Sequence, residues 1–134
     1  MVLMAGQMRT NVGSMRLPIQ SPGAIECAVE LLRGGDVVAF PTDTVYGIGA
    51  HAFLSEAVAQ LYSSKERPDC LAIPLLLADA GDMETVCPCV PPLAWRLAQR
   101  FWPGGLSLVM MRAEVVPDVV TAGRPTVAVR VPGH

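Results

Sequence analysis

Residues 37–51 read VVAFPTDTVYGIGAH, and this stretch says more about the fold than any other part of the chain. The β-rich run at residues 36–40 predicts a short buried strand that leads into a turn at Pro41. After the proline, hydroxyls, a carboxylate and glycines lie close together, a composition that a simple core strand does not need. The stretch therefore predicts a strand followed by a functional polar loop.

Thr42 and Thr44 are two positions apart, so both hydroxyls can point at one ligand if the segment stays extended. A hydroxyl both donates and accepts, which suits recognition of an alcohol or an amino-acid head group. The alternative is local turn capping by Thr and Asp side chains. Tyr46 is open to interpretation as a core aromatic, and Gly47 and Gly49 as residues of a tight turn.

Residues 65–68, KERP, follow after one helix-sized gap. The residue before a proline is driven out of the α region, so Arg67 is expected to be extended and the helix to end near Lys65. If Lys65 is already unwinding, both cations point the same way, whereas a continuing helix would separate them by about 200°. The pair is thus suited to grip anionic substrate groups.

The remaining segments alternate between helical and strand patterns, which predicts an α/β layered domain around a twisted sheet. Helices are expected to begin at Ser21-Pro22, at a Ser55 N-cap and at Pro91-Pro92, and strands to cover 36–40, 73–77, 106–111 and 126–131. The expected core-facing residues of the helices are Ile25, Ala28, Val29 and Leu32, then Val58, Leu61 and Tyr62, then Leu93, Leu97 and Phe101.

The strand expected at residues 126–131 has two unlike faces. Its three valines point one way, while Thr126, Ala128 and Arg130 point the other. Arginine captures a carboxylate or phosphate through two parallel hydrogen bonds, and the small neighbours leave room beside it. The alternative is a solvated face with a structural ion pair, but the other motifs favour a ligand site.

Size and composition indicate a single globular domain. The chain has 134 residues, of which 51% are hydrophobic and 16% charged. Its net charge of -2 argues against a generally basic, nucleic-acid-coating surface, although a local basic cleft stays open. The apolar stretch 71–77 is broken by Pro74 and is far shorter than the roughly 20 residues that a membrane span needs. Residues 1–21 are expected to form a loose N-terminal extension, and residues 22–134 the domain.

Neither a metal site nor a nucleophile is predicted. Cys87 and Cys89 have no second ligand pair or nearby histidine, so reduced thiols are favoured over zinc. The two histidines, His51 and His134, have no recognisable Ser or Cys partner signature. A P-loop is excluded as a motif because no Gly-Lys-Ser/Thr occurs.

Four ordered blocks of the chain resemble the YrdC-like family, the threonylcarbamoyl-AMP synthases of tRNA modification. The blocks are PTDTVYG at 41–47, KERP at 65–68, FWPGGLSLV at 101–109 and VAVRVPGH at 127–134. The resemblance runs from about residue 25 to residue 134.

The resemblance implies an open, twisted mixed sheet with flanking helices and a concave, positively charged cavity. It implies a cytoplasmic nucleotidyltransferase that forms threonylcarbamoyl-AMP and pyrophosphate from L-threonine, bicarbonate and ATP, with Mg²⁺ accompanying the ATP. A partner transferase would then modify adenosine 37 of tRNA, so contact with tRNA is expected to be indirect. By resemblance, L-threonine would be bound by Thr42, Thr44 and Arg130, and ATP by Lys65, Arg67 and Thr126.

The sequence also departs from the family pattern. Leu71 and Leu76 stand where many members carry polar residues, and Gly133 replaces a frequent Asp or Ser. The family's later Ser-x-Asn segment does not occur before His134, so the domain is expected to be incomplete at its C-terminus. Two alternatives follow: a noncatalytic nucleotide- or RNA-binding remnant, and the carbamoyltransferase module of hydrogenase maturation. The latter normally accompanies zinc-finger motifs, and this sequence has none.

Overall fold

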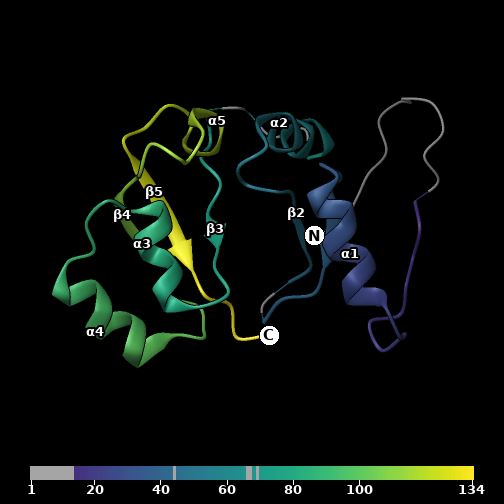
Figure 1. Ribbon diagram of the computed structural model, residues 1–134, viewed down its shortest axis with the longest axis horizontal. Helices are drawn as coiled ribbons and strands as arrows, with labels where there is room; N and C mark the ends of the chain where they lie inside the picture. Colours follow the sequence, from purple (N-terminus) through teal and green to yellow (C-terminus); the bar gives the residue numbers. More distant parts are fainter. Residues whose placement is uncertain (1–13, 44, 66–67, 69) are drawn as a thin grey trace.

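The chain forms an N-terminal layer and a larger sheet body (Figure 1). The computed structural model describes residues 14–43, 45–65, 68 and 70–134. The N-terminal layer consists of α1 (Ala24–Arg33), β1 (Val38–Phe40) and β2 (Gly47–Gly49). The sheet body consists of α2 (Ser55–Ser64), β3 (Leu75–Leu76), η1 (Ala80–Asp82), α3 (Met83–Val86), α4 (Pro92–Phe101), β4 (Leu108–Met111), α5 (Asp118–Thr121) and β5 (Thr126–Arg130).

The described strands divide between two small sheets. In the N-terminal layer β1 and β2 pair antiparallel, and in the sheet body β5 lies between a parallel β3 and an antiparallel β4. The predicted α/β fold with a mixed sheet is confirmed, and each of the four expected strands is present in a shorter form. The additional strand is β2, whose glycines leave room for the Phe40 ring: a Cβ at Gly49 would lie 2.7 Å from it.

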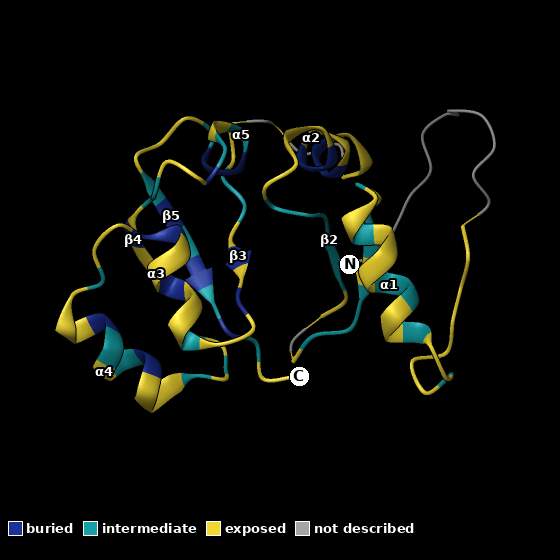
Figure 2. Cartoon of the chain, viewed as in Figure 1, coloured by how far each residue is buried: buried dark blue, intermediate teal, exposed yellow. Residues whose placement is uncertain are grey.

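The hydrophobic core lies wholly within the sheet body (Figure 2). The predicted inward face of the last strand is confirmed, since Val127, Val129 and Val131 are all buried. On the neighbouring strand β4, the buried Leu108 and Met110 pair in register with Val129 and Val127, respectively. The sheet body thus contains its own packed interior.

The N-terminal layer has no such interior. None of the described residues 14–43 and 45–50 is buried, and Ile25, expected to face a core, is 67% exposed. Helix α1 begins within three residues of its predicted start and ends, as predicted, just before Gly34. Residues 14–20 of the expected extension are exposed and contain no helix or strand.

Two further details of the helix predictions are wrong. Ser55 is the first residue of α2 rather than its cap, because Leu54 holds the N-cap position and makes no side-chain cap. Helix α4 buries Ala94 and Ala98, which belong to the adjacent stripe of small residues. These alanines let α4 approach the body closely beside η1, whereas the bulkier Leu93 and Phe101 stay exposed. No helix in the described part of the chain is long and apolar enough to cross a membrane.

Candidate functional site

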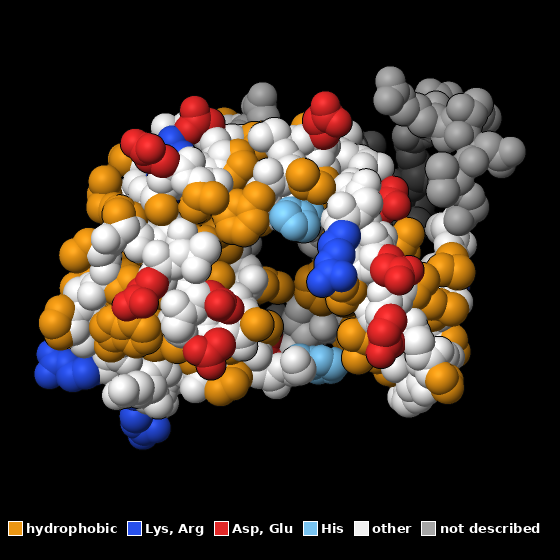
Figure 3. Space-filling view, viewed as in Figure 1, with side chains coloured by type: hydrophobic (Ala, Val, Ile, Leu, Met, Phe, Trp, Pro, Cys, Tyr) orange, Lys and Arg blue, Asp and Glu red, His pale blue; other side chains and the backbone are white. Residues whose placement is uncertain are grey.

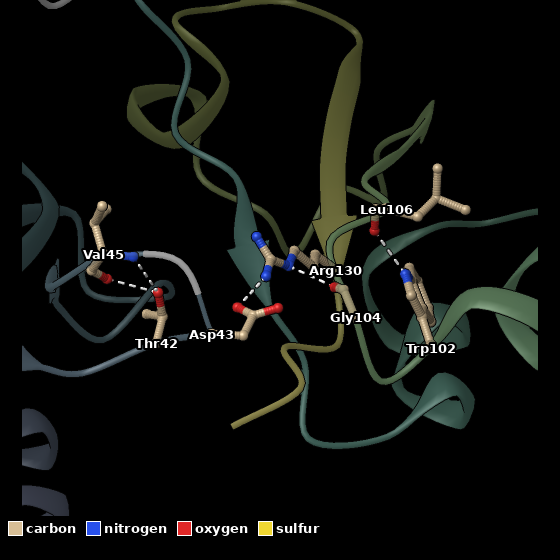
Figure 4. Close-up of polar contacts among 7 residues, drawn as sticks. All are labelled: Thr42, Asp43, Val45, Trp102, Gly104, Leu106 and Arg130. Carbon is tan, nitrogen blue, oxygen red and sulfur yellow. Dashed lines mark hydrogen bonds and ion pairs between the residues drawn. The ribbon is translucent and has the colours of Figure 1, made fainter.

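Arg130 is the last residue of β5, on the face of the strand opposite the buried valines (Figure 4). Among the predicted site residues that the structure describes, its side chain has the most defined contacts. Its Nε donates to the Gly104 carbonyl oxygen at 2.7 Å, and the Gly104 amide donates to the Val131 carbonyl at 2.9 Å. The guanidinium is therefore held in one orientation by the loop after α4. Only 17% of the side chain is exposed, so this is not the solvated arginine of the alternative interpretation.

The loop that anchors Arg130 is itself constrained. Trp102 donates its indole N–H to the Leu106 carbonyl at 2.7 Å, which closes the loop around Gly104. A Cβ at Gly104 would lie 2.6 Å from the Phe101 carbonyl oxygen, so only glycine fits there without a backbone shift. The motif at residues 101–109 thus has a structural purpose: it places one carbonyl oxygen for the arginine.

Asp43 forms an ion pair with Arg130 from the opposite side (Figure 4). It lies in the loop between β1 and β2, so the pair links the N-terminal layer to the sheet body. The loop is shaped by Thr42, whose Oγ1 donates to the Val45 carbonyl at 2.6 Å and accepts from the Val45 amide at 3.2 Å. Thr42 therefore makes the local turn contacts that the sequence left open as an alternative.

Thr126 and Arg130 share the open face of the sheet, as the strand pattern predicts. Both are half-buried, and they lie four positions apart, which is about 13 Å along an extended strand. Leu76 pairs in register with Arg130, and Met111 with Thr126, so apolar side chains border the two polar ones. This spacing suits the two ends of one extended ligand.

Lys65 is exposed at the C-cap of α2, and its amide still donates to the Leu61 carbonyl at 3.3 Å. The predicted end of the helix at this point is confirmed. Thr44 and Arg67 lie outside the described residues, so their predicted roles stay predictions. Sequence reasoning did not assign Asp43 to the site, although it pairs with Arg130. The signal that could have identified it is a carboxylate within the polar segment 41–47.

A cavity of about 310 Å³ separates the two sheets, and the space-filling view shows the molecule hollowed between them (Figure 3). Its walls come from Phe40 and Ile48 of the N-terminal layer, from Val58 and Leu61 of α2, and from β3 and its neighbours. The residues that line it are apolar side chains and a glycine, and the positive charge that the family resemblance implies stays a prediction.

Cys87 and Cys89 lie in unlike surroundings, and His51 makes a local contact. Burial raises the pKa of the Cys87 thiol, while Cys89 is exposed. His51 Nδ1 accepts from the Phe53 amide at 3.3 Å in a local loop contact. Within the described residues, no three His, Cys, Asp or Glu side chains are grouped to hold a metal ion.

The chain is similar to known proteins both in sequence and in fold. The family model for Sua5, YciO and YrdC proteins, described as "Telomere recombination", matches residues 30–134. A threonylcarbamoyl-AMP synthase of Pyrococcus abyssi is 44% identical over 82% of this chain, which covers 32% of that protein. A putative threonylcarbamoyl-AMP synthase of Mycobacterium tuberculosis is 39% identical over 87% of this chain and 54% of its own length.

Among solved structures, P. abyssi Sua5 complexed with L-threonine superposes with a TM-score of 0.80 at 44% identity, over 82% of this chain and 32% of that one. The chain thus spans about a third to a half of the length of these relatives. Its four sequence blocks, its α/β fold and these similarities agree, and the chain belongs to the Sua5/YciO/YrdC family.

Proposed function

We propose that the chain carries the substrate-binding part of a threonylcarbamoyl-AMP synthase, which joins L-threonine, bicarbonate and ATP into threonylcarbamoyl-AMP and pyrophosphate. The strongest support is the oriented Arg130 guanidinium on an open sheet face, in a chain 44% identical to a Sua5 crystallised with L-threonine. The relatives named threonylcarbamoyl-AMP synthase support the same reaction class.

In this proposal Arg130 binds the carboxylate of L-threonine, because a planar guanidinium matches a carboxylate with two parallel hydrogen bonds. Thr42, which is next to Asp43 in the chain, and Thr44 bind the same amino acid, as the family resemblance implies. Thr126, about 13 Å along β5, contacts the nucleotide end. Lys65, at the C-cap of α2, and Arg67 neutralise phosphate charge, as the family resemblance implies.

The proposed chemistry requires orientation rather than a protein nucleophile. The amine nitrogen of threonine bonds to the carbon of bicarbonate, and one C–O bond of bicarbonate breaks with loss of water to give a carbamate. A carbamate oxygen then attacks the α-phosphorus of ATP. Pyrophosphate leaves with the electrons of the broken P–O bond. The protein contributes alignment of the reactants and stabilisation of phosphate charge. Mg²⁺ enters as Mg-ATP, held by phosphates and water, since the described residues offer no carboxylate cluster.

The test is a reaction of the chain with L-threonine, bicarbonate and Mg-ATP, followed by mass spectrometry for threonylcarbamoyl-AMP. We expect product above an enzyme-free control, and a loss of roughly tenfold to a hundredfold in Arg130→Lys, which keeps the charge but not the fork. The matched control is Arg96→Lys, on the exposed side of α4, which should retain full activity. Absence of product from the folded wild-type chain would contradict the proposal.

A second candidate is a noncatalytic nucleotide-binding domain. The observation that favours it is the half-exposed Leu76, which stands beside Arg130 where many family members carry a polar residue. In that case ATP binding would be measurable by calorimetry, while product would be absent even with threonine and bicarbonate at saturation. Transfer to tRNA by a partner transferase, and a cytoplasmic location, stay predictions from the family resemblance.

A further inference from the structure

The Asp43–Arg130 ion pair joins two parts of the molecule that otherwise face each other across the cavity. The Arg130 side chain is 17% exposed and the Asp43 side chain is 20% exposed, so both charged groups are partly shielded from water. An ion pair in such surroundings is less screened than one at the surface. The carboxylate therefore satisfies a guanidinium that would otherwise be left poorly solvated.

The two anchors of Arg130 differ in kind. Gly104 belongs to the sheet body: its carbonyl accepts from Arg130, and its amide donates to the carbonyl of Val131, next to Arg130 itself. Asp43 comes from a loop of the N-terminal layer, whose described residues include no buried side chain. Loss of the Asp43 contact would thus leave the guanidinium oriented and free to take another carboxylate.

We propose that Asp43 is an internal stand-in for the substrate carboxylate, which holds Arg130 in the empty site and is released when an amino acid binds. The inference rests on the proposed function, because it takes the ligand to be an amino acid. Asp43 pairs through Oδ1 with Nη2 of Arg130, and a substrate carboxylate that binds the free end of the guanidinium would need the same nitrogen, so the two carboxylates compete. Asp43 is then a positioning residue that links occupancy of the site to the β1–β2 loop.

The test compares binding of L-threonine to wild type and to Asp43→Asn by isothermal titration calorimetry. Removing the competing charge should lower the Kd for L-threonine about threefold to tenfold. L-Threoninol, which has no carboxylate, should gain nothing. Asp43→Glu restores a carboxylate and should return the affinity to the wild-type range. The matched control is Asp118→Asn, which removes the acid of the Arg112 ion pair and should leave binding unchanged.

A second measurement uses the wild-type chain alone. Saturating L-threonine should shift the Asp43 carboxylate ¹³C resonance and the Arg130 Nε–Hε cross-peak, which Arg130→Lys would identify by its loss. L-Threoninol should leave the Asp43 resonance in place. Equal or weaker threonine binding in Asp43→Asn, or an unmoved Asp43 resonance at saturation, overturns the inference.

An acetate titration separates this inference from the proposed function. If neither protein binds L-threonine, the proposed function fails. The Arg130 cross-peak then decides the role of Asp43, with ionic strength held constant by chloride. A response to acetate at lower concentration in Asp43→Asn than in wild type supports the internal carboxylate, and an identical response rejects it.

Discussion

The N-terminal layer and the sheet body differ in how they use their residues. Every buried side chain of the described structure lies in the sheet body, between Ala57 and Val131. The described residues of the N-terminal layer include none that is buried, yet this layer provides Asp43, which pairs with Arg130. The contrast teaches that burial is concentrated in one region: the sheet body supplies the packed interior, and the N-terminal layer supplies the acidic partner of Arg130.

The largest expected effect tests the core of the sheet body. Met83 in α3 is fully buried, so Met83→Ala should lower the free energy of unfolding by about 2–5 kcal/mol through lost burial and a residual cavity. The matched control is Met111→Ala on the open sheet face, where the side chain is 55% exposed and the cost should stay within about 1 kcal/mol. Urea unfolding followed by circular dichroism measures both. If the two variants lost equal free energy of unfolding, burial at Met83 would not contribute more to stability than the exposed position of Met111.

An intermediate effect tests the loop that joins the body to the site. Gly104→Ala places a Cβ 2.6 Å from the Phe101 carbonyl, and relief of this overlap should cost about 1–3 kcal/mol of stability. The neighbouring Gly105→Ala, with no atom within 4 Å of the new Cβ, serves as control. Chemical denaturation compares the two. If Gly104→Ala is as stable as Gly105→Ala, the loop is less rigid than its contacts indicate.

The smallest expected effect tests the N-terminal layer. Ile25 lies on α1 with most of its surface in solvent, so Ile25→Ala should change the free energy of unfolding by no more than about 0.5 kcal/mol. Leu61→Ala, at a buried position of α2, is the matched control and should cost about 2–5 kcal/mol. A large loss at Ile25, measured in the same urea titration, would mean that α1 packs against something else in solution.

Local patterns in the sequence predicted much of the fold because they depend on near neighbours. The alternation at residues 126–131 correctly gives the buried valines and the face of Arg130. Pro68 correctly predicts that α2 ends by Lys65. Helix α4 shows where such reasoning fails, because two stripes of apolar residues share its helical period. The stripe that packs against the sheet body contains the small Ala94 and Ala98. Which stripe is buried depends on the space available to the whole helix, and a local pattern does not contain that information.

Long-range contacts account for the rest. Asp43 and Arg130 are separated by 87 positions, so nothing in the local pattern of either predicts their pairing. The division of the strands into two sheets likewise depends on which distant segments meet. Within the candidate site, the face and chemistry of Arg130 could be predicted, whereas its carbonyl anchor and its acidic partner required the fold.

Trp102 gives the molecule an optical reporter of its own. Its indole N–H is bound to the Leu106 carbonyl within the loop that presents Gly104 to Arg130, and the chain has just one other tryptophan, Trp95. In a Trp95→Phe background, the emission maximum of Trp102 would therefore read out strain or movement in the anchoring loop. Occupancy of the arginine could then be followed by intrinsic fluorescence, on the time scale of mixing and without any attached label.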